Sequence, residues 1–175
     1  MNTTLLLGAT SAMAEHTARR LAADGDTLIL GGRNPEKLEI LKQDLLARGA
    51  RAVEVLPPFD AAAPDSLPPV LEALKLVDPD RVLVAFGDLP DPEDCEADPV
   101  AAARAMQVNA VSVMQLLTPL ANRMEEQEDG VIAVISSVAG LRGRQSNYHY
   151  GAAKGALNVF LQGLRNRLQP AGVRV

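Results

Sequence analysis

The sequence predicts an α/β fold in which helices cover both faces of a doubly wound, mainly parallel sheet. Short apolar runs of strand length alternate with segments of helical spacing along all 175 residues, and the connections between them are short. Glycines follow three of the apolar runs, where the chain turns from strand to helix. We therefore expect a single domain over residues 1–175 with the order βαβαβαβαβαβ.

The first expected strand, residues 3–7, runs into a glycine turn and then into a helix. In such a turn, backbone N–H groups at the helix N-terminus can bind a pyrophosphate. The turn has one glycine, Gly8, followed by Ala12 and Ala14, and the Ala12 methyl narrows the approach of a phosphate. The residues expected at this site are Gly8, Thr10, Ser11, Ala12 and Met13.

The second expected strand covers residues 26–31, and a helix follows from residue 35 to residue 48, closed by Gly49. The end of this strand should reach the adenosine ribose, where an acidic residue would bind a 2′-hydroxyl and repel a 2′-phosphate. The chain instead has Gly32 followed by Arg33, which favours NADP over NAD. The alternative is that Arg33 is only a solvated loop arginine.

A third strand is expected at 51–56, a helix at 65–76 and a fourth strand at 81–87. The fourth strand ends in Phe86 and Gly87, where a cofactor ribose would lie at the switch point of a doubly wound sheet. The acidic, proline-rich stretch 88–98 is expected to be a loop at the mouth of the site. A long helix over 99–126 contains Asn109, a residue poorly suited to a helix interior.

The stretch 136–154 combines a hydroxyl, a phenol and an ammonium group in one segment. Ser137 follows the apolar run 130–136, so it should lie just past the carboxyl end of a fifth strand. Tyr150 and Lys154 are four residues apart in the next helix, expected over 148–168, and share one face. An ammonium at about 5 Å and an effective dielectric constant near 20 favours the phenolate by about 3 kcal/mol. Tyr148 is six residues from Lys154 and is the poorer acid; we expect it in the pocket wall.

With Ser137 thirteen residues before Tyr150, this stretch resembles the short-chain dehydrogenase/reductase family. The resemblance covers essentially the whole chain, because Gly8, Asp60, Gly87 and Asn109 also fall in the family's order. It implies a Rossmann fold that binds NAD(P), and hydride transfer between the nicotinamide and a small-molecule carbonyl or alcohol.

The resemblance also implies a role for each matching residue. Ser137 would hydrogen-bond the substrate oxygen and Tyr150 would donate the proton. Lys154 would assist Tyr150 and hold the nicotinamide ribose, and Asn109 would hold a water that relays protons to Lys154. Asp60 would contact the adenine; its alternative role is to cap a turn near residues 61–65. For Asn109 the alternative is a polar residue whose hydrogen bonds are satisfied within the fold.

The chain departs from the family at two places. Ala12 and Ala14 replace the second and third glycines of the family's turn, and Ala85-Phe86-Gly87 replaces the usual Asn-Ala-Gly. This ending, together with Arg142 and Arg144 before Tyr150, is similar to the branch that reduces polyprenyl-phosphate-linked keto-sugars. The two arginines favour an anionic substrate, unless they are simply solvated loop charges.

Two other functions compete with the reductase. Ala12 and Ala85 are compatible with a dinucleotide-binding or sensing protein that kept the fold and lost catalysis. A sugar-nucleotide epimerase shares the Tyr-x-x-x-Lys arrangement, but it normally needs a substantial C-terminal substrate domain that this sequence lacks.

Composition narrows the function classes further. A net charge of −5 without a Lys/Arg block argues against nucleic acid as a partner. Cys95 is the only cysteine, so an internal disulfide and a cysteine-based zinc site are excluded, no metal is expected, and a cytoplasmic location is the natural expectation. We expect neither a signal peptide nor a membrane span.

Two expectations concern assembly and the end of the chain. A homodimer or homotetramer is expected through apolar residues of the two long helices, which are Val111, Met114, Leu117, Val159, Phe160 and Leu164. Residues 173–175 should open a sixth strand, beyond which the family has a Pro-Gly turn over the nicotinamide, a substrate lid and a seventh strand. We therefore expect these 175 residues to be the truncated part of a longer reductase that alone binds cofactor weakly.

Overall fold

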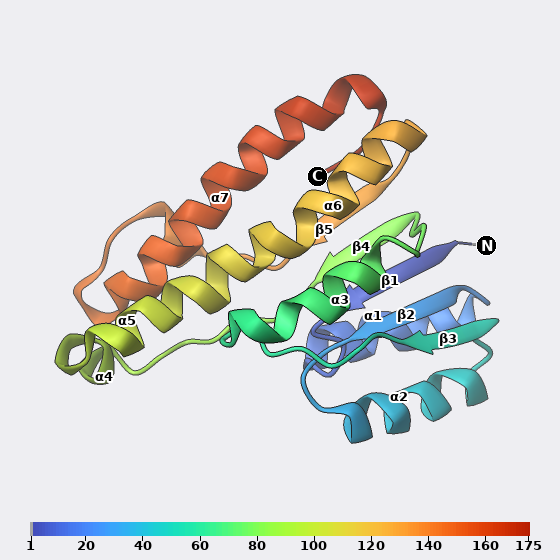
Figure 1. Ribbon diagram of the computed structural model, residues 1–175, viewed down its shortest axis with the longest axis horizontal. Coiled ribbons are helices and arrows are strands. Elements are labelled where there is room, and N and C mark those ends of the chain that lie inside the picture. The colour runs from blue at the N-terminus through green and yellow to red at the C-terminus, as the bar shows by residue number, and fades with distance from the viewer. Residues whose placement is uncertain (1) are drawn as a thin grey trace.

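The computed structural model describes residues 2–175, which form a five-stranded parallel sheet in the order β3-β2-β1-β4-β5 (Figure 1). The strands are β1 (Thr3–Leu7), β2 (Thr27–Gly31), β3 (Ala52–Val55), β4 (Arg81–Val84) and β5 (Val131–Val134). The α-helices are α1 (Ala12–Ala23), α2 (Pro35–Ala47), α3 (Leu67–Leu74), α4 (Pro92–Ala97), α5 (Pro99–Met106), α6 (Ser112–Gln127) and α7 (Tyr148–Leu168). The predicted doubly wound α/β fold is confirmed.

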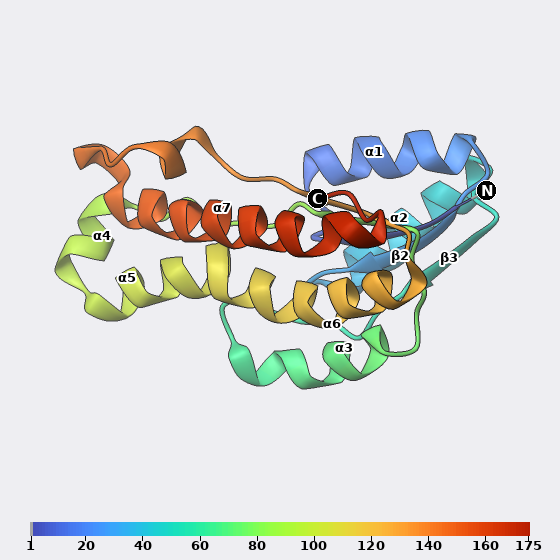
Figure 2. The same cartoon turned by 90° about the horizontal axis from the view of Figure 1, so that it is seen from above.

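Two apolar cores lie on opposite faces of the sheet because successive strand side chains point to opposite sides. Leu5 and Leu7 of β1 face the core that α3, α6 and α7 cover, whereas Leu6 faces the core that α1 and α2 cover. Figure 2 shows α1 and α3 on opposite sides of the sheet. Both cores are mainly aliphatic, as expected from the low aromatic content.

Local sequence explains how the helices on the α1 side begin. Ser11 caps α1 by accepting a hydrogen bond from the Ala14 backbone N–H at 3.3 Å. Asn34 caps α2 by accepting from Lys37 N–H at 2.9 Å, with a proline at the start of the helix. The strands that precede these caps are paired in parallel register, so their carboxyl ends meet at one edge of the sheet.

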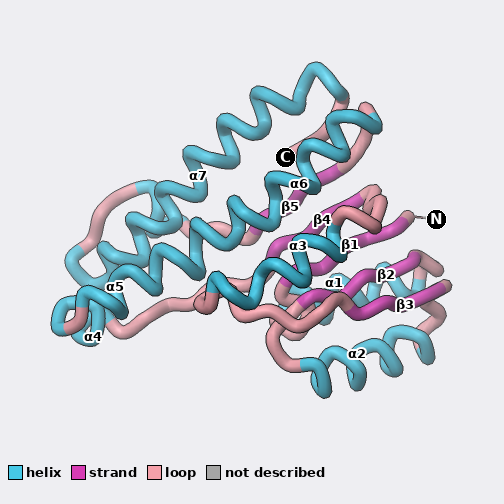
Figure 3. The backbone as a smooth tube through the Cα atoms, in the orientation of Figure 1, coloured by secondary structure: helices cyan, strands magenta, loops and turns pink. Residues whose placement is uncertain are grey.

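The region between β4 and β5 differs from the sequence prediction in two respects. The expected loop 88–98 contains the short helix α4, capped by Asp91. The expected helix 99–126 is divided into α5 and α6 by a π-helical turn, Gln107–Val111 (Figure 3 shows the helical path). Because a π turn inserts an extra residue into the helical repeat, it changes the direction of the side chains at its centre, and Asn109 is one of them.

Burial divides the six residues that were expected at a subunit interface. Leu117 and Leu164 belong to the apolar core of the chain itself, so that part of the expectation is wrong. Val111 and Val159 are exposed, and Met114 and Phe160 are half-buried.

The end of the chain and the membrane expectation can also be compared with the structure. Arg174 forms an isolated parallel bridge with Val131 of β5, in keeping with the strand expected over residues 173–175. None of the helices in residues 2–175 has the length and apolar character needed to span a bilayer.

Candidate functional site

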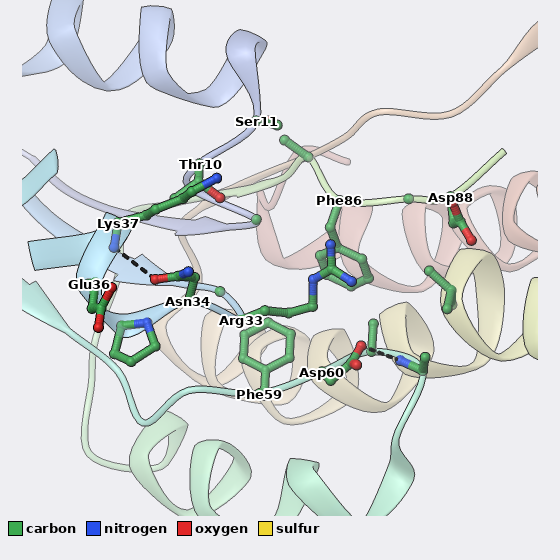
Figure 4. Close-up of a pocket in the computed structure, with 18 of the residues that line it drawn as sticks. Thr10, Ser11, Arg33, Asn34, Glu36, Lys37, Phe59, Asp60, Phe86 and Asp88 are labelled. Atoms are coloured by element: carbon green, nitrogen blue, oxygen red, sulfur yellow. Dashed lines mark hydrogen bonds between the residues drawn. The ribbon is translucent and has the colours of Figure 1, made fainter. Parts of the chain in front are cut away.

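A cavity of about 890 Å³ opens at the carboxyl edge of the sheet, around the ends of β1, β2 and β4 (Figure 4). Six charged side chains contribute to its wall. The residues that line it are Gly8, Thr10, Ser11, Gly32, Arg33, Asn34, Pro35, Glu36, Lys37, Phe59, Asp60, Ala61, Ala62, Ala85, Phe86, Gly87, Asp88, Arg104 and Val108. Seven of the predicted cofactor residues are among them.

The glycine turn after β1 forms the floor of the cavity next to the end of β4. Gly8 has φ +83°, and a Cβ added there would lie 2.7 Å from the Phe86 backbone nitrogen. Only glycine satisfies both conditions, because the positive φ strains other residues and the space is already occupied. Ala12 and Met13 are exposed and do not line the cavity, so the Ala12 methyl does not narrow it as expected. Their N–H groups at the start of α1 stay predicted pyrophosphate donors.

Two basic side chains, one from the turn before α2 and one from its first turn, lie at the cavity on the β2 side. Figure 4 shows the Arg33 guanidinium extending toward the Phe86 ring and the Lys37 ammonium directed toward Thr10. Arg33 is exposed and lines the cavity, and its contact with a 2′-phosphate stays a prediction. The Asn34 cap fixes the first turn of α2 and thereby the position from which Lys37 extends.

Asp60 has the capping role that the sequence left as one of two alternatives, and its contact with the adenine stays a prediction. Its Oδ1 accepts a hydrogen bond from the Ala62 backbone N–H at 3.0 Å, which makes it a turn cap. It also lines the cavity beside Phe59, whose ring meets Phe86 edge to face at 6.0 Å between centroids. The cap holds the carboxylate in place at the cavity wall.

Gly87 connects this cavity to the predicted catalytic groups, none of which lines the cavity itself. A Cβ added at Gly87 would lie 2.9 Å from Asn109 Oδ1 and 3.4 Å from Lys154 Nζ. Asn109 is fully buried; its Nδ2 donates to the carbonyl oxygens of Asp88 and Ala105, and its Oδ1 accepts from Asp88 N–H. The hydrogen bonds of Asn109 are thus satisfied within the fold, as the alternative interpretation expected. The π turn directs the Asn109 side chain toward the loop after β4.

Tyr150 and Lys154 lie together on α7, as their spacing predicts. Lys154 Nζ is 5.8 Å from the centroid of the Tyr150 ring and donates to the Ile135 carbonyl oxygen at 3.3 Å. Only 3% of Lys154 is exposed, and this burial lowers the pKa of its ammonium group. A buried ammonium without a carboxylate partner within ion-pair distance among residues 2–175 is costly to retain, which points to a functional reason for it.

Tyr148 differs from Tyr150 in its surroundings. Its ring stacks on His149 at 4.1 Å between centroids, and like the predicted catalytic residues it does not line the cofactor cavity. Its expected place in the wall of the substrate pocket stays a prediction. Loss of solvent around its hydroxyl, followed by the negative charge of Glu96, raises the pKa of Tyr148.

The turn that carries Ser137 is packed directly against the start of α7. Ser137 Oγ accepts a hydrogen bond from Ala139 N–H at 3.1 Å and caps the 3₁₀ turn Val138–Leu141. A Cβ added at Gly151 would lie 2.8 Å from the Ala139 carbonyl oxygen. Ser137 is therefore held beside the helical turn that contains Tyr150. Arg142 and Arg144 follow in the same loop and are exposed.

Replacing Gly140 by alanine should destabilise the protein strongly, because a Cβ there would lie 2.6 Å from the Lys154 carbonyl carbon and 2.7 Å from Gly155 N. Backbone atoms cannot move aside as a flexible side chain can. We therefore expect the free energy of unfolding to fall by about 2–3 kcal/mol and the melting temperature to fall by about 5–10 °C. Gly143→Ala is the matched control, because its added Cβ meets nothing within 4 Å. Equal melting temperatures for the two variants would show that this contact is not tight.

Sequence reasoning missed Lys37 and Arg104, which both line the cavity. Lys37 is the third residue of a helix that begins Pro-Glu-Lys after the Asn34 cap, so its position near the ribose end was readable from the sequence. Arg104 lies four residues before Val108 and shares its helical side, but only the packing of α5 against the sheet end reveals which side faces the cavity.

Comparison with known proteins agrees with this geometry. The family model for short chain dehydrogenase matches residues 2–175. An uncharacterized oxidoreductase of Streptomyces coelicolor is 39% identical over 98% of this chain and 68% of its own length, and one of Mycobacterium tuberculosis is 36% identical over 98% and 69%. A short-chain dehydrogenase from Sphingobium yanoikuyae in complex with NADPH superposes with a TM-score of 0.90 at 26% identity, covering 99% of this chain and 68% of that one.

A second solved structure, NAD⁺-bound xylitol dehydrogenase, has a TM-score of 0.86 at 23% identity over 99% of this chain and 67% of its own, and supports the fold alone. The whole-length family match and the 39% identical relative extend over the glycine turn, the end of β4 and the segment from Ser137 to Lys154. By fold, by site and by these relatives, the chain belongs to the short-chain dehydrogenase family.

Proposed function

We propose that the protein is an NADP(H)-dependent oxidoreductase that transfers a hydride between the nicotinamide and a carbonyl or alcohol substrate. The observation that carries the proposal is the place of Gly87, which lines the cofactor-sized cavity and also lies next to Asn109 and Lys154. A dinucleotide in the cavity would thus end beside the groups that handle protons. The residues present fit that cofactor, since the Gly8 turn and the start of α1 offer backbone N–H groups to a pyrophosphate.

The bound nicotinamide would supply or accept the hydride, and the residues of the chain handle the proton and the substrate oxygen. Ser137 Oγ already accepts from Ala139 N–H, so its own proton is left to donate to the substrate oxygen. Tyr150 donates the proton as negative charge develops on that oxygen, and the Lys154 ammonium stabilises the resulting phenolate.

Asn109 fits the proposed proton relay in spite of its internal hydrogen bonds. Its Oδ1 accepts from Asp88 N–H, and a carbonyl oxygen has a second lone pair. The same oxygen and Lys154 Nζ both lie within 3.4 Å of the position that a Cβ on Gly87 would occupy. A water bridging these two groups would carry a proton to the lysine.

The experiment that tests the function follows the absorbance of NADPH during incubation with ketones, aldehydes and phosphorylated keto compounds. Oxidation of NADPH that requires both the protein and a carbonyl compound would support the reductase function. Saturable NADPH binding without turnover on any compound would instead favour the dinucleotide-binding protein that has lost catalysis.

The proposed preference for NADP(H) rests on two cations at the β2 end of the cavity. Arg33 and Lys37 approach from the start of α2, and Figure 4 shows the Glu36 carboxylate directed away from the Lys37 ammonium. No acidic side chain replaces Gly32 at the strand end, where it would repel a 2′-phosphate. Two cations at this point suit a phosphate better than a hydroxyl.

Arg33→Ala and Lys37→Ala should each raise the Kd for NADPH about tenfold or more and leave the Kd for NADH nearly unchanged. A charge-assisted contact to phosphate contributes about 1.5–3 kcal/mol, and only NADPH has the 2′-phosphate. Fluorescence titration of both cofactors measures the effect, with Lys42→Ala on the same helix as control. Equal affinities of the unmodified protein for NADPH and NADH would contradict the preference.

The substrate proposal follows the charges beside the site. The Ala85-Phe86-Gly87 ending and the exposed Arg142 and Arg144 favour an anionic carbonyl compound, such as a keto-sugar linked to a polyprenyl phosphate. The exposed Val111 and Val159 support association of two copies through the α6 and α7 side.

A further inference from the structure

The catalytic groups come from two separate parts of the chain. Ser137 belongs to a turn after β5, whereas Tyr150 and Lys154 belong to α7. Between them lies an exposed loop, residues 141–146, which cannot fix their relative position. Hydride transfer to a carbonyl needs the hydroxyl and the phenol aimed at the same oxygen, so a direct connection between turn and helix is required.

Asn158 lies on the same side of α7 as the catalytic residues. Tyr150, Lys154 and Asn158 follow each other at intervals of four residues, so they form one stripe along the helix. Asn158 accepts a hydrogen bond from the Ser136 hydroxyl, and both residues are half-buried, which reduces competition from water for this bond. The stripe faces the turn, because Gly140 of the turn packs against the α7 backbone and Gly151 of α7 packs against the Ala139 carbonyl oxygen of the turn.

The Asn158 side chain reaches both ends of the turn that carries Ser137. Its Oδ1 accepts a hydrogen bond from Ser136 Oγ at 2.6 Å, immediately before Ser137. Its Nδ2 is 2.8 Å from the point where a Cβ on Gly140 would lie, three residues after Ser137. One amide group therefore bonds the chain just before the serine and fills the space beside Gly140 just after it.

We propose that Asn158 is a positioning residue: with Ser136 it clamps the turn so that the Ser137 hydroxyl stays in register with Tyr150 and Lys154. The proposal rests on the proposed reductase function for its catalytic consequence, but the clamp itself does not. The absence of a side chain at Gly140 is part of the device, because a methyl group there would occupy the space of the amide.

Ser136→Ala and Asn158→Ala should each lower kcat about 10–100-fold while KM for the carbonyl and Kd for NADPH change less than about threefold, since a displaced hydroxyl mainly impairs the chemical step. The double variant should be no slower than the slower single variant, because both remove the same bond. Ser136→Thr keeps a hydroxyl and should restore most of kcat. Asn166→Ala, an exposed asparagine of the same helix, is the matched control.

Amide hydrogen exchange tests the clamp without turnover. Ala139 and Gly140 N–H donate to Ser137 Oγ and to the Ser137 carbonyl oxygen, so both should exchange at least about tenfold faster in the two alanine variants. Unchanged exchange, unchanged kcat or multiplying losses in the double variant would overturn the proposal. If the unmodified protein has no activity, the reductase function fails, and the exchange rates still decide the clamp.

Discussion

Tyr150→Phe should lower kcat/KM about 10³-fold or more and leave the Kd for NADPH within about twofold. The substitution removes only the hydroxyl that donates the proton, and general acid catalysis of this kind contributes about 10²–10⁴-fold. The ring itself is retained, so the contact with Lys154, 5.8 Å from the ring centroid, stays possible. Steady-state reduction of the best carbonyl substrate, together with cofactor titration, measures both quantities.

Tyr148→Phe is the control for this prediction, because the same atom is removed two residues away. Its ring stacks on His149, and the raised pKa of its hydroxyl makes proton donation less favourable at neutral pH. We expect kcat/KM within about threefold of the unmodified protein. The opposite ranking of the two variants would assign the acid to Tyr148.

Lys154→Met should abolish turnover and at the same time raise the melting temperature of the protein without cofactor. Burial lowers the pKa of the Lys154 ammonium, which means that folding disfavours its charge. Methionine has a similar length and no charge. We therefore expect the free energy of unfolding to rise by about 1 kcal/mol, which raises the melting temperature by about 2–4 °C for a domain of this size. A lower melting temperature would show that the bond to the Ile135 carbonyl outweighs the cost of burial.

The pH dependence of that gain gives a second measurement. Below the lowered pKa the lysine is charged in the folded and the unfolded protein, so the unmodified protein bears the full cost. As the pH rises from the lowered pKa toward the ordinary value of 10.5, the unfolded chain binds more protons than the folded one and the unmodified protein gains stability. The advantage of Lys154→Met should therefore be largest below the lowered pKa and shrink as the pH rises through this window.

The sequence was sufficient for the parts of the fold that depend on local patterns. The glycine turn at Gly8 and the helix 148–168 depend on residues within one or two turns of each other, and the structure has them where they were expected. The four-residue spacing of Tyr150 and Lys154 belongs to the same class. Their closeness follows from helix geometry alone.

What the sequence could not predict depends on contacts between distant segments. The π turn at Asn109 is one example: its side chain bonds the backbone of Asp88, 21 residues earlier, and apolar periodicity does not register one inserted residue. The burial of Leu117 and Leu164 depends on how α6 and α7 pack together. The short helix α4 was hidden by its acidic and proline-rich composition, which is also typical of loops.

The contact between the Ser137 turn and α7 also bears on how a protein of this family can acquire new specificities. Ala139 and Gly140 meet the helix, whereas their neighbours Val138 and Leu141 are 70% and 76% exposed. A side chain at Gly140 would meet the backbone of α7, whereas the side chains at positions 138 and 141 face solvent and can change without that clash. Substitutions at positions 138 and 141 can accumulate beside the predicted catalytic residues without displacing them. We therefore expect relatives to diverge in this turn, and a mutant library for altered substrate choice would best begin there.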